Sequence, residues 1–289
     1  MKPEIVLFSK HLQWCAREEL PRAVRAAGAD GLDLTVRPGG HVAPERVEDE
    51  LPDYVRLCRS AGSDVLMICT AIEKASDITT EKILKTAASL GIKYYRMGWL
   101  DYPADIRSGL DDIKSRLKDL AAMNEHYGIR GAYQNHDGRW FGAPVWDLAR
   151  LLDEIDSPWL GVQYDVLNAT IEGCKSWPLA YDFIKPHIHT IAVKDAVWRK
   201  TKGGWRIEYR PLGRGWMEAA VFIKKEKGRG GPVPFTMHFE YELGGAETGA
   251  AKLTLSGDKV IAAMKKDVAF LRRLWYETEP GDTTESNRK

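Results

Sequence analysis

The stretch "IRSGLDDIKSRLKDLAAMNEHYGIRGAYQNHDG", residues 106–138, contains the unit from which most of the chain is built. Its first part, 106–128, has the apolar spacing of an amphipathic helix and ends in Gly128, a residue type that tolerates the left-handed helix cap. A short strand pattern follows and ends in four polar residues, 134–137. This order predicts an α/β protein whose strands end in side chains able to bind or react.

The same alternation of short apolar runs and helical patterns recurs along the chain. Strands are predicted at 4–9, 31–37, 64–70, 93–99, 129–136, 160–166, 189–195 and 233–241, and helices at 18–28, 47–62, 78–91, 106–128, 145–155 and 257–277. Strands joined through helices form parallel sheets, and eight such units predict a closed (β/α)8 TIM barrel. The main alternative is an open doubly wound sheet, but "FSKHLQW" follows its first strand in place of a glycine-rich phosphate turn.

No linker or composition break divides the chain, so residues 1–278 are predicted to form one domain. One insertion interrupts the alternation: "WRKTKGGWRIEY" (198–209) predicts a short β-hairpin after the seventh strand, turning at Gly203 and Gly204. The polar tail 279–289 is predicted to be disordered.

The composition excludes several classes of partner. The 289 residues are 44% hydrophobic and 29% charged, with a formal net charge of +1 and no long block of one sign. This balance argues against nucleic acid and membrane surfaces as partners. The four cysteines have no close spacing, which fits a reducing compartment, and neither a signal peptide nor a membrane span is evident. We therefore expect a cytoplasmic protein.

Polar pairs end the last four predicted strands. Side chains two residues apart share a face of a strand, which gives Gln134 with His136, Gln163 with Asp165, Ala192 with Lys194, and His238 with Glu240. Earlier strand ends add Lys10 or His11, Arg37, His41 and Arg96. Each alone has a structural explanation, such as a helix cap or a solvated pair. Four successive polar pairs, however, are costly to bury without a purpose and predict a pocket at the barrel mouth.

Aromatic and glycine-rich segments are less informative. Four tryptophans and two arginines could stack on or bond to a sugar ring (Trp14, Trp99, Trp140, Trp177, Arg37, Arg96), although most of the tryptophans are better explained as packing at the barrel rim. "RPGGHV" and "PLGRG" are interpreted as turns rather than as phosphate-binding loops.

Several motifs resemble a known family. "AYQNHDG", "GVQYDVLNA", "AVKDAVW", "PLGRG" and "HFEYELGGAE" resemble, in order and spacing, the sugar phosphate isomerase/epimerase group of xylose isomerase-like TIM barrels. "TVRPGGHV", "NHDG" followed by "FGAPVWDL", and "SWP" are similar to a bacterial branch of that group. The resemblance covers roughly residues 4–275 and implies the barrel fold; one fold hosts many reactions.

The resemblance also implies a metal site and shows where this chain departs from it. Relatives hold one divalent metal with a Glu, an Asp, a His and a Glu, which fall here on Gln134, Asp165, Ala192 and Glu240. A substrate-contacting His of many relatives falls on Asn168. Gln134 cannot take up a proton, and Ala192 cannot ligate.

Two arrangements remain open for the altered ligand set. His136 and His238 could supply replacement ligands, so that Gln134, His136, Asp165 and Glu240 remain candidates for Mn²⁺, Mg²⁺ or Zn²⁺. Alternatively, the Lys194 ammonium takes over part of the role of the metal by pairing with Asp165. No organic cofactor is expected.

Three functions follow from these residues. The first is isomerisation or epimerisation of a sugar or keto-sugar by proton abstraction beside a carbonyl, with Glu240 or His238 as base and Lys194 as electrophile. The substrate would contact Lys10, His41, Arg96, Gln134, His136 and Asn168. The second is cleavage of a 3-keto-glycoside by β-elimination, which needs one base and one acid. The third is a sugar-binding barrel without catalysis. Barrels of this type often pair through their rims, so a homo-oligomer is also considered.

Overall fold

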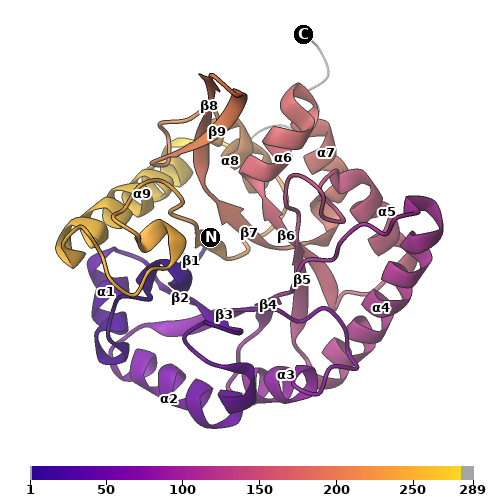
Figure 1. Cartoon of the computed structure of the whole chain (residues 1–289), viewed down its shortest axis with the longest axis horizontal. Coiled ribbons are helices and arrows are strands. Elements are labelled where there is room, and N and C mark those ends of the chain that lie inside the picture. Colours follow the sequence, from indigo (N-terminus) through magenta and orange to yellow (C-terminus); the bar gives the residue numbers. More distant parts are fainter. Residues whose placement is uncertain (1, 281–289) are drawn as a thin grey trace.

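Eight parallel strands close into a barrel that is surrounded by helices (Figure 1). The structure is a computed structural model and describes residues 2–280. Around the barrel the strands follow the order β1-β10-β7-β6-β5-β4-β3-β2, so the last strand closes against the first. The predicted (β/α)8 TIM barrel is confirmed. Within the described residues, no helix combines the length and the apolar character needed to cross a membrane.

The barrel strands are short, and most are followed by at least one helix. The strands are β1 (Ile5–Phe8), β2 (Gly31–Val36), β3 (Asp64–Thr70), β4 (Tyr94–Arg96), β5 (Arg130–Gln134), β6 (Leu160–Asp165), β7 (Ile188–Val193) and β10 (Phe235–Met237). The α-helices are α1 (Leu20–Ala26), α2 (Val47–Ser60), α3 (Thr80–Ser89), α4 (Ile106–Tyr127), α5 (Val145–Ile155), α6 (Val166–Gly173), α7 (Trp177–Ile184), α8 (Ala219–Lys227) and α9 (Gly257–Glu277). Short 3-10 turns include η1 (Ser9–Leu12) after β1 and η6 (Ala246–Thr248) after β10.

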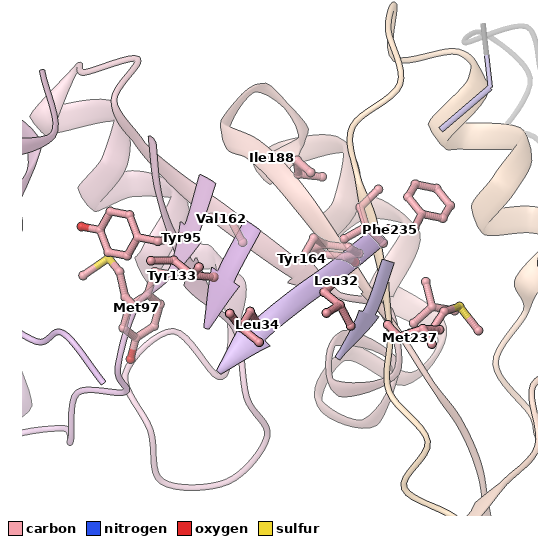
Figure 2. Packing of buried hydrophobic residues seen from close by; sticks show 14 of the residues in the cluster. Leu32, Leu34, Tyr95, Met97, Tyr133, Val162, Tyr164, Ile188, Phe235 and Met237 are labelled. Atoms are coloured by element: carbon pink, nitrogen blue, oxygen red, sulfur yellow. The ribbon is translucent and has the colours of Figure 1, made fainter. Parts of the chain in front are cut away.

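Alternate residues of each strand face the helices and the barrel interior. Figure 2 shows outward residues such as Tyr95, Tyr164 and Phe235 within the buried hydrophobic cluster. Phe235, for example, packs edge-on against Trp275 of α9, with ring centroids 5.8 Å apart. The residues between them point inward and are often polar: Thr236 donates from Oγ1 to Asp33 Oδ2 across the interior, at 2.9 Å. The two-residue repeat of a strand therefore delivers polar side chains to the inside.

Several strands end earlier than the sequence predicted. β5 ends at Gln134, so His136 lies in the loop beyond it, and β10 ends at Met237, so His238 and Glu240 follow the strand. Regular pairing stops at these residues, although His238 N still donates to Val193 O at 3.0 Å. The functional candidates thus lie on strand ends and on the segments directly after them, the usual position of barrel active sites.

The predicted hairpin is present as β8 (Asp195–Thr201) and β9 (Gly204–Arg210), which pair antiparallel. Its turn lies at Lys202 and Gly203, one residue earlier than predicted. The hairpin stands beside α8 at the rim of the barrel (Figure 1). Most of the predicted tail, residues 281–289, lies outside the described residues.

Asp195 anchors the return from the hairpin to the barrel. Its Oδ2 accepts from the backbone N–H groups of Gly213 and Gly215 at 2.9 and 2.8 Å, and its Oδ1 accepts from Met217 N at 3.2 Å. A Cβ atom on Gly215 would lie 2.0 Å from Asp195 Oδ1, so this close approach requires glycine. "PLGRG" is therefore a turn, as predicted, and Asp195 has a structural role distinct from that of Lys194 beside it.

Candidate active site

A buried ion pair lies at the centre of the barrel mouth. Lys194 follows β7, Asp165 ends the neighbouring strand β6, and Lys194 Nζ lies 3.2 Å from Asp165 Oδ2. The side chains are 3% and 0% exposed. Such a pair is stable only if further hydrogen bonds satisfy both groups, since burial removes their hydration.

Gln134 supplies one of those hydrogen bonds and links the pair to Arg96. Its Nε2 donates to Asp165 Oδ2 at 2.9 Å, and its Oε1 accepts from Arg96 Nη1 at 2.8 Å. The position therefore needs one donor and one acceptor on the same side chain, which an amide provides. A glutamate would place a second carboxylate against Asp165. This explains why β5 ends in glutamine.

Two asparagines hold Asp165 in position. Asn135 Oδ1 accepts from Asp165 N at 2.7 Å, and its Nδ2 donates to Asp165 O at 3.1 Å. Asn168 N donates to Asp165 Oδ1 at 3.0 Å, which makes Asp165 the N-cap of α6, and Asn168 Nδ2 donates to Asn135 O. Asn168 was predicted to contact substrate; its amide oxygen is buried without a partner among the described residues. Asn135 has a supporting position that its place in the polar run "QNHD" could have indicated.

Lys194 is held as an ammonium ion. Burial alone would lower the pKa of its amine, but the carboxylates of Asp165 and Glu240 more than offset this and raise the pKa above its usual range. Both predicted carboxylates therefore act on one cation. A permanently protonated lysine can polarise a carbonyl group, whereas it cannot act as a nucleophile.

Glu240 is the carboxylate that is open to the mouth. Its side chain is 23% exposed, and Oε1 lies 3.6 Å from Lys10 Nζ and 4.0 Å from His238 Nδ1. Burial raises the pKa of this carboxyl group, but Lys194 and Lys10 outweigh burial and hold the pKa below its ordinary value. Glu240 is thus ionised at neutral pH.

The segment that carries Glu240 is fixed by two histidines and Phe8. His238 stacks on Phe8 with ring centroids 4.7 Å apart, and its Nε2 is buried with no partner among residues 2–280. Burial, followed by Lys194, lowers the pKa of His238 well below its usual value, so its ring is neutral. His11 Nε2 accepts from Phe239 N at 3.1 Å, which requires the proton on Nδ1, facing Ala246 O. Burial lowers the pKa of His11 to about 4.

Of the remaining predicted residues, His136 lies at the barrel mouth and His41 does not. The His136 ring meets Trp99 edge-on at 4.8 Å, and its charge when protonated lowers the pKa of Glu240. His41 is bound instead into a cluster near β1 and β2, with Nδ1 3.2 Å from Ser9 Oγ and 3.0 Å from Thr35 Oγ1. Sequence reasoning missed Tyr209 of β9, whose ring centroid lies 5.7 Å from Lys194 Nζ. A residue contributed by an insertion carries no strand-end signal.

The residues at the mouth do not fit a divalent metal. The described residues contain no group of three or more His, Cys, Asp or Glu side chains that could hold a metal ion. The set considered from the sequence, Gln134, His136, Asp165 and Glu240, is therefore not assembled as a metal site. Asp165 Oδ2 already accepts from Gln134 and Lys194, and a divalent cation beside it would be repelled by the ammonium.

Comparison with known proteins places the fold in a family. The family model described as "Xylose isomerase-like TIM barrel" matches residues 21–240. The chain belongs to this family. The resemblance read from the motifs is confirmed at the level of the xylose isomerase-like barrels. No curated protein matches the chain at a significant level.

Solved structures similar to this xylose isomerase-like barrel include sugar epimerases. D-psicose 3-epimerase from Clostridium cellulolyticum H10 with D-tagatose has a TM-score of 0.73 at 12% identity, over 95% of this chain and 99% of that one. 3-Keto-D-glucoside 4-epimerase from E. coli, in the apo form, has a TM-score of 0.67 at 13% identity, over 94% and 100%. A xylose isomerase-like protein from Mycobacterium smegmatis in complex with magnesium has a TM-score of 0.67 at 16% identity, over 96% and 99%. At these identities the likeness shows the fold alone.

Proposed function

We propose that this protein is an enzyme that abstracts a proton beside the carbonyl group of a sugar or keto-sugar, with the Lys194 ammonium in the place of a metal. The observation that carries the proposal is the Lys194–Asp165 pair at 3.2 Å beside the partly open Glu240. Within the pair, Lys194 supplies an ammonium group that Asp165 holds in place, and Glu240 supplies an ionised carboxylate beside it. An electrophile and a base side by side are what enolisation requires.

The reaction begins with the carbonyl oxygen of the substrate at Lys194. Glu240 takes the proton from the neighbouring carbon, the electrons of the C–H bond form a carbon–carbon double bond, and the carbonyl electrons move onto oxygen. Lys194 stabilises the resulting negative charge, and Glu240 becomes a neutral acid. Return of this proton to the former carbonyl carbon, together with transfer of the hydroxyl proton of the neighbouring carbon to the former carbonyl oxygen, gives an isomer. Return of a proton to the same carbon from the opposite face, which gives an epimer, needs a second acid.

β-Elimination is the second candidate reaction, because the site has no second base to pair with Glu240 for a two-base epimerisation. Gln134 cannot exchange a proton, whereas His136, with 27% of its side chain exposed, can donate one to a leaving oxygen. Loss of the substituent on the next carbon, with its bonding electron pair and the proton of His136, would cleave a 3-keto-glycoside. One base and one acid are sufficient for that reaction.

A deuterium-exchange experiment tests the shared step. The chelator-treated protein is incubated in D₂O with ketoses, inososes and 3-keto-glycosides, and exchange beside the carbonyl is followed by NMR. We expect exchange that Glu240→Gln abolishes and that Glu242→Gln, on an exposed neighbouring residue, preserves. A rearranged sugar indicates isomerisation, and a released aglycone indicates elimination. Melting shifts with sugars but no exchange would contradict catalysis and favour a binding barrel.

A further inference from the structure

A hollow adjoins the candidate active site at the carboxyl ends of β2, β3 and β4. Its volume is about 490 Å³, and its charged lining residues are Arg37, Arg96, Arg116, Glu73 and Asp101. Three guanidinium groups around one cavity are unusual for a neutral sugar, whose hydroxyl groups do not require so many full charges.

The two acidic residues of this hollow already have partners. Arg116 Nη2 lies 3.7 Å from Glu73 Oε2, and Arg139 Nη2 lies 2.7 Å from Asp101 Oδ1. Within residues 2–280, by contrast, no ion pair is formed by Arg37 or Arg96. The hollow therefore retains two guanidinium charges that its own carboxylates do not neutralise.

The two arginines without an ion pair have few hydrogen-bond acceptors around them. Arg96 is 3% exposed, and its Nε has no hydrogen-bond partner among the described residues. Its guanidinium lies over the Trp99 ring at 4.4 Å, which fixes its plane, and Trp99 Nε1 is also buried without a partner. The Arg37 guanidinium lies over the Phe8 ring at 5.5 Å, and among the described residues its hydrogen-bond partner is Cys69 Sγ, a weak acceptor 3.7 Å from Nη1. Buried donors without partners are destabilising unless a ligand completes them.

The buried carboxyl group of Asp33 is influenced by the charges of both arginines, but it does not fill the hollow. Its Oδ2 accepts from Thr236 Oγ1 inside the barrel, and it makes no contact with either guanidinium within 4.0 Å. Burial raises the pKa of Asp33 to about 6, although Arg96 and Arg37 oppose this. Asp33, inside the barrel, therefore offsets part of the positive charge of Arg37 and Arg96 without accepting hydrogen bonds from them.

Gln134 connects the hollow to the candidate active site. Arg96 donates to its Oε1, and its Nε2 donates to Asp165, the partner of Lys194. A glutamate at this position would pair with Arg96 and neutralise it. With glutamine, the charge of Arg96 is not balanced by a carboxylate at this position, one side chain away from the proposed carbonyl position.

We propose that this hollow binds an oxyanion group of the substrate through Arg37, Arg96 and Trp99, so that the substrate is an anionic sugar rather than a neutral one. The inference deepens the proposed function and rests on it for the position of the carbonyl at Lys194. A carboxylate at one end of a sugar acid and a phosphate on a sugar phosphate share this chemistry, since both accept paired N–H donors from guanidinium groups.

Isothermal titration of the full chain with matched sugars tests the inference. The probes are D-glucuronate and D-gluconate for the carboxylate, D-glucose 6-phosphate for the phosphate, and D-glucose as the neutral sugar. We expect at least one anionic probe to bind about tenfold or more tightly than D-glucose, because hydrogen bonds to charged groups contribute this much when buried. Which anionic class binds more tightly identifies the source of the oxyanion.

Substitutions of Arg37 test whether the preference for anionic sugars arises in this hollow. Arg37→Gln should weaken the anionic probe by about tenfold and leave D-glucose unchanged, whereas Arg37→Lys, which keeps the charge, should recover part of the loss. Arg150→Gln, on the exposed face of α5, is the matched control and should bind as the parent does. Unchanged melting temperatures show that each variant is folded.

Two results would overturn the inference: no millimolar binding of any anionic probe, or a preference that survives Arg37→Gln. The proposed function is tested separately by deuterium exchange. If neutral keto-sugars exchange and Arg37→Gln does not change the rate, the proposed enzyme activity is supported and the anion site is contradicted. Arg37-dependent binding of an anionic probe, without exchange in either the neutral keto-sugars or an anionic one such as D-fructose 6-phosphate, would support the anion site and contradict the proposed enzyme activity.

Discussion

Two buried ion pairs of this molecule differ in what surrounds them. Glu226 of α8 has a fully buried side chain, and Arg229 Nε lies 2.8 Å from its Oε1 while Tyr181 Oη donates to its Oε2 at 2.6 Å. Arg229 also donates to Gly231 O, so this pair is enclosed by protein partners. Around Lys194 and Asp165, in contrast, several polar atoms are buried without a partner in the part of the chain that the structure describes: His238 Nε2, Asn168 Oδ1, Arg96 Nε and Trp99 Nε1.

This difference indicates that the Glu226–Arg229 pair has a structural role, whereas the Lys194–Asp165 pair belongs to a ligand-binding site. Each pair contains a fully buried carboxylate, and hydrogen bonds must offset the cost of burying its charge. At Glu226 the protein itself supplies those bonds. At the barrel mouth, by contrast, the unpartnered donors and acceptors are available to a bound ligand. The following substitutions test this difference between the two pairs.

Replacing Lys194 should have the largest effect. Lys194→Met removes the only charge partner of Asp165 within 4.0 Å among the described residues, and with it the proposed stabilisation of the enolate. We expect exchange activity to fall by about 100- to 1,000-fold, the usual cost of losing one preorganised electrostatic contact. Steady-state kinetics on the best substrate of the panel measures this, with Lys202→Met in the hairpin turn as control. Activity within a few-fold of the parent would contradict the role of Lys194.

Replacing Arg229 should reduce stability but not chemistry. Arg229→Met leaves Glu226 buried without its cation, which should lower the free energy of unfolding by about 3 kcal/mol. Turnover per folded molecule should stay at the parent value because α8 lies outside the mouth. Denaturant titration and kinetics below the melting transition check both statements, with the exposed Arg273→Met as control. A selective loss of turnover would remove the contrast between the two pairs.

Asp33, inside the barrel beneath the hollow, gives a pH-dependent prediction. Because its pKa is raised from 3.8 to about 6, the folded protein keeps this proton between those values and the unfolded chain does not. The free energy of unfolding should therefore fall as pH rises from about 4 to about 6, by up to about 3 kcal/mol, and no longer change through this group at higher pH.

Asp33→Asn should remove that contribution and leave the smaller slope due to Asp267, whose pKa burial also raises to about 6. Urea titrations at several pH values measure the slope, with the exposed Asp258→Asn as control. An unchanged slope in Asp33→Asn would mean that this carboxyl group is ionised throughout.

The smallest expected effect is that of Tyr209 at the edge of the site. Its ring contacts the Lys194 ammonium, an interaction that contributes about 0.5–1 kcal/mol in partly exposed positions. Tyr209→Ala should raise KM or lower kcat by about threefold, whereas Tyr209→Phe, which keeps the ring, should behave as the parent. Equal losses in both variants would assign the effect to the hydroxyl group.

The sequence predicted the barrel because its signals are local. The two-residue alternation in "GVQYDV" places Gln163 and Asp165 inward whatever the exact strand length, and a glycine marks the end of several helices, as Gly128 does for α4. Strand ends were less predictable: His238 and Glu240 follow β10 because the chain leaves the sheet there to meet His11, a contact across 228 residues that no local pattern contains.

The sequence predicted most residues of the candidate site, but only some of the contacts between their side chains. Lys194 and Asp165 come from neighbouring strands, so their pairing follows from the fold. The bridge from Arg96 through Gln134 to Asp165 depends on side-chain directions that the sequence leaves open. Tyr209 was missed because it reaches the mouth from an insertion, whose position relative to the barrel is fixed by the contacts of Asp195 with the loop after β9.

Titration of the chelator-treated protein with Mn²⁺, followed by the electron paramagnetic resonance signal of the free ion, tests the central claim most directly. If the Lys194 ammonium occupies the place of the metal, the free Mn²⁺ signal should rise in proportion to added ion, and Asp165→Asn should give the same line. Stoichiometric loss of the signal in the parent protein, abolished by Asp165→Asn, would show that Asp165 holds a metal and would contradict the account.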